Sequence, residues 1–146
     1  MESDFAAIVT PALPLAFRDV LRVEVDDITT ADERAQREVN VSGPAAFVIM
    51  KAHALWLRGE NKDAYDLVYM LRSYGSDPIA DVADRFAIIM DAPEALAALV
   101  FLAEDFETEE HLGPRRYAEF LGDAGHAERR AEAFGAVREF LRRAGS

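Results

Sequence analysis

Five charged residues that lie close together in the chain have side chains of the kinds that bind phosphate or act on hydroxyl groups. They are Lys51, Arg58, Lys62, Asp63 and Asp66. A lysine or arginine can stabilise negative charge on a phosphoryl group, and a carboxylate can orient or deprotonate a hydroxyl. Elsewhere in the sequence we find no pattern that points to chemistry, so this stretch is the candidate functional site.

Two helices and a short turn are predicted to carry these residues. Ser42 can cap a helix whose first turn holds Pro44, because the missing N–H of proline is not needed there. Gly59 can end that helix, and Asn61 can cap a second helix that stops at Gly75. The stretch is therefore predicted to form an αα-hairpin.

Spacing along the two helices brings the charged side chains together. Lys51 and Arg58 lie two turns apart and share one flank of the first helix. Asp63 and Asp66 lie three residues apart at the start of the second helix, so both carboxylates can meet those cations. The residues of the first helix expected to face the interior are Phe47, Met50, Ala54, Leu55 and Leu57. A compact charged cluster is predicted at the hinge.

A purely structural interpretation of the cluster is equally open at this point. Asp63 can complement the positive end of its own helix dipole, and a pair between Arg58 and an aspartate can fix the packing angle of the hairpin. Ion pairs of this structural kind outnumber catalytic ones. Spacing alone therefore does not separate the two interpretations.

The wider pattern favours a functional site. A lysine lies within an apolar helix, IMKAHALWL at residues 49–57, and is followed by Arg58 and by KDAYDL at residues 62–67. This pattern resembles the C-terminal signature of AbiEii-type nucleotidyltransferases, bacterial toxins of the abortive-infection and toxin–antitoxin class. The flanks are similar too, with strand-like VLRVEV at residues 20–25 and VNVSGP at residues 39–44 leading into the lysine helix.

We expect a single domain, residues 1–146, of the helix-dominated α+β class, with two short strands followed by five or six helices. The later helices are expected over residues 78–90, from Pro93 onward, over 112–121 and over 127–144. The domain resembles the C-terminal helical part of a nucleotidyltransferase-like protein. On that resemblance, its residues follow the strand that holds the metal in the family.

The resemblance implies nucleotidyl transfer from an NTP, in a toxin-like role. Lys51 is then expected to contact a phosphate, and Asp66 or Asp63 to act near the metal or the attacking hydroxyl. Arg58 and Lys62 are the expected substrate-binding residues.

Two motifs of the family are not found. The sequence has no Asp-x-Asp, and no Gly-Gly or Gly-Ser turn precedes the adjacent pair Asp26 and Asp27, whose side chains would point to opposite faces of a strand. We therefore expect the chain alone to be inactive and to hold no cofactor, with Mg²⁺ and NTP implied only for a complete enzyme. Whether the chain is an enzyme stays open.

The alternative function is a non-catalytic helical module for protein interaction or dimerisation. An isolated two-stranded ribbon is marginal in water, so the strand at residues 20–25 is where a partner is expected to dock. The partner would be a missing N-terminal nucleotidyltransferase half or a second copy of the chain. The resemblance to a toxin family implies an antitoxin as a further partner.

Composition limits the remaining possibilities. The formal net charge of −11 disfavours non-specific binding to nucleic acid. Cysteine is absent, which excludes disulfides and thiolate zinc sites and favours the cytoplasm. The longest apolar run, residues 95–103, is far below the roughly 20 residues needed to span a bilayer. We expect no contact with a membrane.

Several other conspicuous residues are expected to be structural. The aromatic residues Trp56, Tyr65, Tyr69 and Tyr74 recur at helical intervals, which is typical of a core or subunit interface. His53 points away from Lys51, because positions two apart on a helix differ by about 200°. Arg115 and Arg116 are expected as a surface pair, and the acidic residues 104–110 as a solvated loop.

Overall fold

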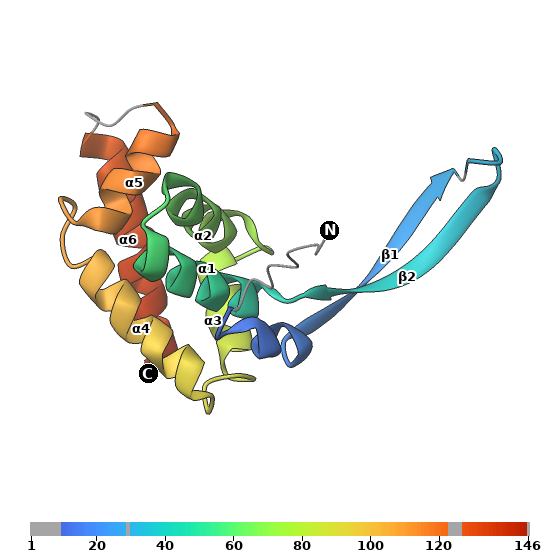
Figure 1. Ribbon diagram of the computed structural model, residues 1–146, viewed down its shortest axis with the longest axis horizontal. Helices are drawn as coiled ribbons and strands as arrows, with labels where there is room; N and C mark the ends of the chain where they lie inside the picture. Colours follow the sequence, from blue (N-terminus) through green and yellow to red (C-terminus); the bar gives the residue numbers. More distant parts are fainter. Residues whose placement is uncertain (1–9, 29, 123–126, 146) are drawn as a thin grey trace, which may run out of the picture.

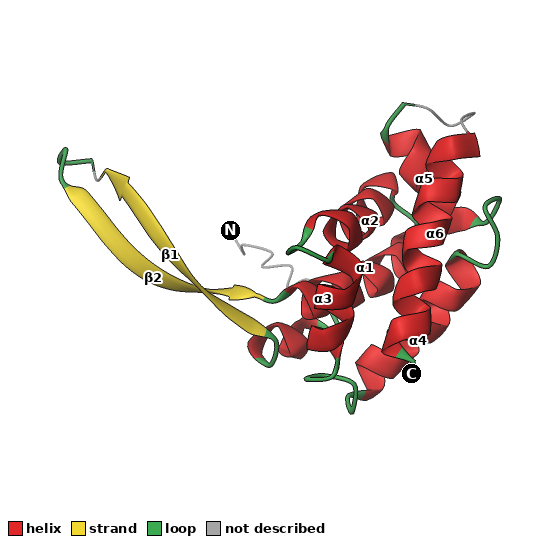
Figure 2. Ribbon diagram, turned by 180° about the vertical axis from the view of Figure 1, so that it is seen from behind, coloured by secondary structure: helices red, strands yellow, loops and turns green. Residues whose placement is uncertain are grey.

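The computed structural model describes residues 10–28, 30–122 and 127–145. These residues form two strands and six α-helices after one short 3-10 helix, which confirms the helix-dominated α+β class. The elements are the 3-10 helix Leu13–Phe17, β1 Val20–Ile28, β2 Arg34–Ser42, α1 Pro44–Arg58, α2 Asn61–Ser73, α3 Pro78–Phe86, α4 Pro93–Asp105, α5 Leu112–Phe120 and α6 Ala127–Ala144. The helices form one body, from which the two strands project as a long ribbon (Figures 1 and 2).

The ribbon is an antiparallel hairpin that reaches further than the short strands expected from the sequence. Its register pairs Val20 with Ser42 at the base and Ile28 with Arg34 near the tip. Side chains alternate between the two faces of a strand, so the valines of the repeating Val-x-Val patterns fall on one face. Leu21 and Val23 of β1 therefore lie opposite Val41 and Val39 of β2.

The apolar face of the ribbon has no covering layer among the described residues. Val23, Val25, Val39 and Val41 are each 39–44% exposed. An isolated hairpin is marginally stable in water and normally packs against further strands or a helix. The strand at residues 20–25 thus belongs to a hairpin whose apolar face is open to solvent.

A buried carboxylate fixes the base of the ribbon to the helical body. The backbone C=O of Asp19 accepts from the N–H of Gly43 (2.6 Å), and its side chain, 0% exposed, accepts from the N–H of Ala46 (3.0 Å). Arg85 of α3 donates from Nε to the same carboxylate (2.7 Å). Asp19 thus takes the capping role predicted for Ser42, which makes no cap bond to α1 because Gly43 occupies the cap position.

The core lies where α1 packs against α2, α3 and α4, and α6 closes the other side. Its largest fully buried side chains are Phe86, Phe106, Phe140, Ile49, Leu55, Leu67, Leu71, Ile89 and Leu102. The inward face predicted for α1 was wrong in part, because Leu55 is fully buried while Leu57 is 78% exposed. Positions two apart on a helix point about 200° apart, so these two residues cannot share a face.

Several helix ends follow the predicted turn residues, but Asn61, like Ser42, does not take its predicted cap role. Gly59 ends α1 in the left-handed conformation (φ 64°), and Pro44, Pro78 and Pro93 each open a helix. Asn61, predicted to cap α2, lies inside that helix, and its side-chain oxygen instead accepts from Arg116 of α5 (3.2 Å). No helix among the described residues is long and apolar enough to cross a membrane.

Asp105, expected in a solvated loop, is instead 8% exposed at the C-terminal end of α4. Burial, and to a lesser degree the charge of Glu104, raises its pKa to about 6. The pKa of Asp105 in the folded chain is thus above its value in the unfolded chain, about 3.9. The ionised carboxylate therefore destabilises the fold. This destabilisation is complete above about pH 6 and absent below about pH 4, where the carboxyl group is protonated in both states.

We therefore expect Asp105→Asn to raise the free energy of unfolding by about 2 kcal/mol at pH 8, with a gain that disappears as the pH falls to about 4. Urea unfolding of both proteins across this range measures the difference. Asp84→Asn, at an exposed position of α3, is the matched control. A gain from Asp105→Asn that does not change with pH would contradict the prediction.

Candidate functional site

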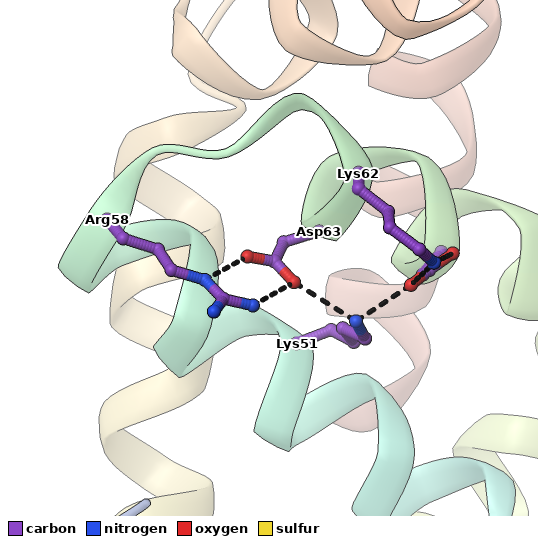
Figure 3. Close-up of polar contacts among 5 residues, drawn as sticks. Lys51, Arg58, Lys62 and Asp63 are labelled. Carbon is purple, nitrogen blue, oxygen red and sulfur yellow. Dashed lines mark hydrogen bonds and ion pairs between the residues drawn. The ribbon is translucent and has the colours of Figure 1, made fainter. Parts of the chain in front are cut away.

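The turn between α1 and α2 brings together the five residues predicted from the sequence, and we call them the charged cluster (Figure 3). Lys51 Nζ lies 3.0 Å from Asp63 Oδ1 and 2.7 Å from Asp66 Oδ2. Arg58 donates from Nε and Nη2 to the two oxygens of Asp63 (2.7 and 2.9 Å). Lys62 donates to both oxygens of Asp66 (2.9 and 2.7 Å). The predicted meeting of both aspartates with a cation of α1 is confirmed, since Asp63 contacts Lys51 and Arg58 and Asp66 contacts Lys51.

Exposure separates the cluster into an inner and an outer part. The side chain of Asp63 is 1% exposed, and those of Asp66 and Lys51 are 16% and 20% exposed. The outer cations, Arg58 and Lys62, are more than half exposed. The inner groups are thus fixed by packing and bonding, while the outer cations face solvent, where a ligand can reach them.

All charges of the inner part are held in place by their neighbours. Burial alone would raise the pKa of Asp63, but its bonds with Arg58 and Lys51 outweigh burial and lower the pKa. The pKa of Asp66 is lowered in the same way by Lys51 and Lys62. For Lys51, burial would lower the pKa, and the two carboxylates raise it instead. Neither carboxylate has a pKa near neutrality, so the arrangement suits electrostatic stabilisation better than proton transfer.

The cluster does not fit a magnesium ion. Every oxygen of its two carboxylates accepts a bond from a lysine or an arginine, whereas Mg²⁺ needs carboxylate oxygens free to coordinate it. Across residues 10–28, 30–122 and 127–145 there is no group of three or more potential metal ligands. The cluster contains three cations and two carboxylates, so its formal charge is +1.

The use of lysine in this chain is a second signal for the site, which residue spacing does not reveal. Lysine and arginine together number 16, yet Lys51 and Lys62 are the only lysines in the chain. Arginine suits bidentate pairing, whereas lysine provides a compact ammonium with three donors that can turn. In a chain that otherwise uses arginine, both lysines lie beside Asp66 in the same cluster.

The residues expected to be structural divide into two groups. His53 packs as expected, with Nε2 2.8 Å from the carbonyl oxygen of Glu94. Tyr65 and Tyr74 pack against the core. Trp56 and Tyr69, however, are 46% and 55% exposed, so these two rings do not lie in the core. One face of the Trp56 ring stacks on Phe101 of α4 (4.6 Å), and Tyr69 stacks on Tyr65 of its own helix (5.8 Å).

Similarity to a known family extends over most of the chain. A family model described as nucleotidyl transferase AbiEii toxin, Type IV TA system, matches residues 11–141. No curated protein and no solved structure matches the chain. The matched range contains the β-hairpin and all five residues of the charged cluster.

Proposed function

Because the chain belongs to the AbiEii family of nucleotidyl transferase toxins, we propose that it is the nucleotide-handling helical part of an NTP-dependent nucleotidyltransferase. The observation that carries this proposal is Lys51, whose ammonium group is held between two carboxylates inside the matched range. A lysine fixed in this way stays charged and is oriented before a substrate arrives. Such preorganised charge is the main source of catalysis in phosphoryl transfer.

Each residue of the charged cluster has a proposed role. Lys51 contacts a phosphate of the NTP and offsets the charge that develops on the transferred group. Arg58 and Lys62, the exposed cations, bind the rest of the polyphosphate. Asp66, the more accessible of the two carboxylates, orients the acceptor hydroxyl, while Asp63 holds Lys51 and Arg58 in position.

We also propose that the chain does not complete transfer on its own. The geometry at the hairpin supports this, because Asp26 and Asp27 do not converge on a common site. Asp26 pairs with Arg34 (3.2 Å), and Asp27 accepts from the N–H of Ile28 (2.7 Å). Strand alternation places the two carboxylates on opposite faces. The metal ligands of a complete enzyme would then come from another polypeptide segment.

The proposed place for that segment is the exposed apolar face of the hairpin. A strand added to one edge would pair the open backbone groups, and a covering layer would bury Val23, Val25, Val39 and Val41. In a toxin of this family the other proposed partner is an antitoxin. Copurification of the chain with the product of a neighbouring gene would identify either one.

Lys51→Ala is the variant that tests the proposed function. We expect it to weaken NTP binding at least tenfold, measured by calorimetry with magnesium present, because charge-assisted hydrogen bonds contribute about 1.5–3 kcal/mol. The control is Arg138→Ala, which removes an exposed cation from α6. Since the chain has two lysines, acetylation followed by mass spectrometry gives a second readout, in which NTP should protect Lys51.

A second candidate function is favoured by the closed form of the charged cluster. Because each inner charge already has a partner, the cluster can serve purely to fix the angle between α1 and α2. The chain would then be a non-catalytic interaction module that dimerises or binds a partner through its hairpin. Normal NTP affinity with a lowered melting temperature in Lys51→Ala would favour this module and contradict the nucleotide role.

A further inference from the structure

Two exposed aromatic rings lie next to the charged cluster on the face shared by α2 and α5. Tyr69 and Phe120 are 55% and 43% exposed. Both stack on Tyr65, which lies between them, with ring centroids 5.8 Å and 4.4 Å away and interplanar angles of 27°. We call these three rings the aromatic platform. Tyr117, 6.1 Å from Tyr65, backs the platform from the core side.

The platform continues the surface of the charged cluster. Along α2, Lys62, Asp66 and Tyr69 recur at intervals of four and three residues, so they share one face of the helix. A ligand anchored by its phosphates at Lys62 would therefore extend along this face toward Tyr69. The aromatic platform is thus positioned to contact the part of such a ligand that lies beyond its phosphates.

A further cation reaches the same face from α5. Arg116 lies one turn before Phe120, and its Nη1 donates to Asn61 at the start of α2 (3.2 Å). The same nitrogen lies 2.9 Å from the carboxylate of Glu119, and the side chain of Arg116 is 38% exposed. In a chain with a formal net charge of −11, this face gathers four cations, Lys51, Arg58, Lys62 and Arg116, which pair with three carboxylates, Asp63, Asp66 and Glu119.

We propose that the aromatic platform stacks the base of the nucleotide whose phosphates bind at the charged cluster. This inference rests on the proposed function and adds the part of the substrate that the cluster cannot recognise. Aromatic rings stack any nucleobase through its π-face, so the platform provides affinity for nucleotides over bare polyphosphate without selecting one base. Tyr65, which Tyr117 backs, contacts the other two rings and holds them in place before the base arrives.

The test compares two ligands that differ only in the nucleoside, ATP and inorganic tripolyphosphate. Calorimetry with magnesium measures both on the wild-type chain, on Tyr69→Ala and on Phe120→Ala. Removing a ring on which the base stacks weakens binding, so each variant should lose roughly tenfold in ATP affinity, which is about 1.4 kcal/mol. Tripolyphosphate affinity should stay unchanged, and Tyr69→Phe should retain ATP binding.

Trp56→Ala is the matched control, because Trp56 is also half exposed but stacks on Phe101 of α4 (4.6 Å). It should change neither affinity. The inference is overturned if wild-type ATP and tripolyphosphate affinities are equal, or if the platform variants bind ATP normally. Either result would assign the rings to contact with a protein partner. Lys51→Ala should weaken the binding of both ligands. If tripolyphosphate binds this variant as tightly as it binds wild type, the proposed function is overturned, independently of the result for the aromatic platform.

Discussion

Replacing Arg85 by alanine should lower the free energy of unfolding by about 3–5 kcal/mol, which is the cost of leaving a buried charge without its partner. The group left without its partner would be the carboxylate of Asp19, which is 0% exposed and accepts a hydrogen bond from Arg85 Nε (2.7 Å). Its other side-chain bond comes from the N–H of Ala46 at the start of α1 (3.0 Å). One backbone donor cannot offset the loss of a guanidinium.

Chemical unfolding of the purified chain measures this effect. Arg138→Ala, at an exposed position of α6, should change the stability by less than about 0.5 kcal/mol. If Arg85→Ala does not fold, Arg85→Lys provides the test, since it keeps the charge but loses the fork of donors that also reaches the carbonyl oxygen of Val20 (3.2 Å). Wild-type stability in both variants would contradict the prediction.

The contacts of Asp19 also determine how the hairpin is placed. Arg85 binds both the Asp19 carboxylate and the backbone of β1, so α3 holds the first residues of the ribbon. Gly43 completes this junction, because a Cβ at that position would overlap the Asp19 carboxylate. The direction in which the ribbon leaves the helical body in Figure 1 is thus fixed by three residues distant from one another in the sequence.

The charged cluster could be predicted from the sequence because its geometry is local. Gly59 ends α1, α2 begins two residues later, and helical spacing then dictates which side chains meet. The Asp19–Arg85 pair could not be predicted in this way. It joins residues 66 positions apart, and nothing in the pattern around either residue identifies the other.

Exposure was the second property that sequence patterns could not supply. Apolar and aromatic residues at helical intervals predict a buried face, and this holds for Tyr65 but not for Tyr69. Whether a position is covered depends on how far the neighbouring helix extends, and α5 ends at Phe120. The same limit applies to the hairpin, where alternation predicts an apolar face but not the layer that would cover it.

Within the charged cluster, Asp63→Ala should have the largest effect on stability, about 3 kcal/mol. Asp63 is 1% exposed and is the only group among the described residues to which Arg58 donates a hydrogen bond. Lys51 would keep Asp66 as a partner, which limits the loss. Lys62→Ala, in contrast, removes only an exposed pair with Asp66 and should cost well under 1 kcal/mol.

The pH dependence of this loss gives the prediction its sharpest test. Because Arg58 and Lys51 hold the pKa of Asp63 below its ordinary value, its contribution is present above about pH 4 and is lost as the pH falls through the folded pKa. The raised pKa of Lys51 keeps the contribution intact up to about pH 10.5. The stability difference between wild type and Asp63→Ala should therefore be constant from about pH 5 to 10 and should shrink in acid. A difference that persists in acid would mean that Asp63 acts by packing and not by its charge.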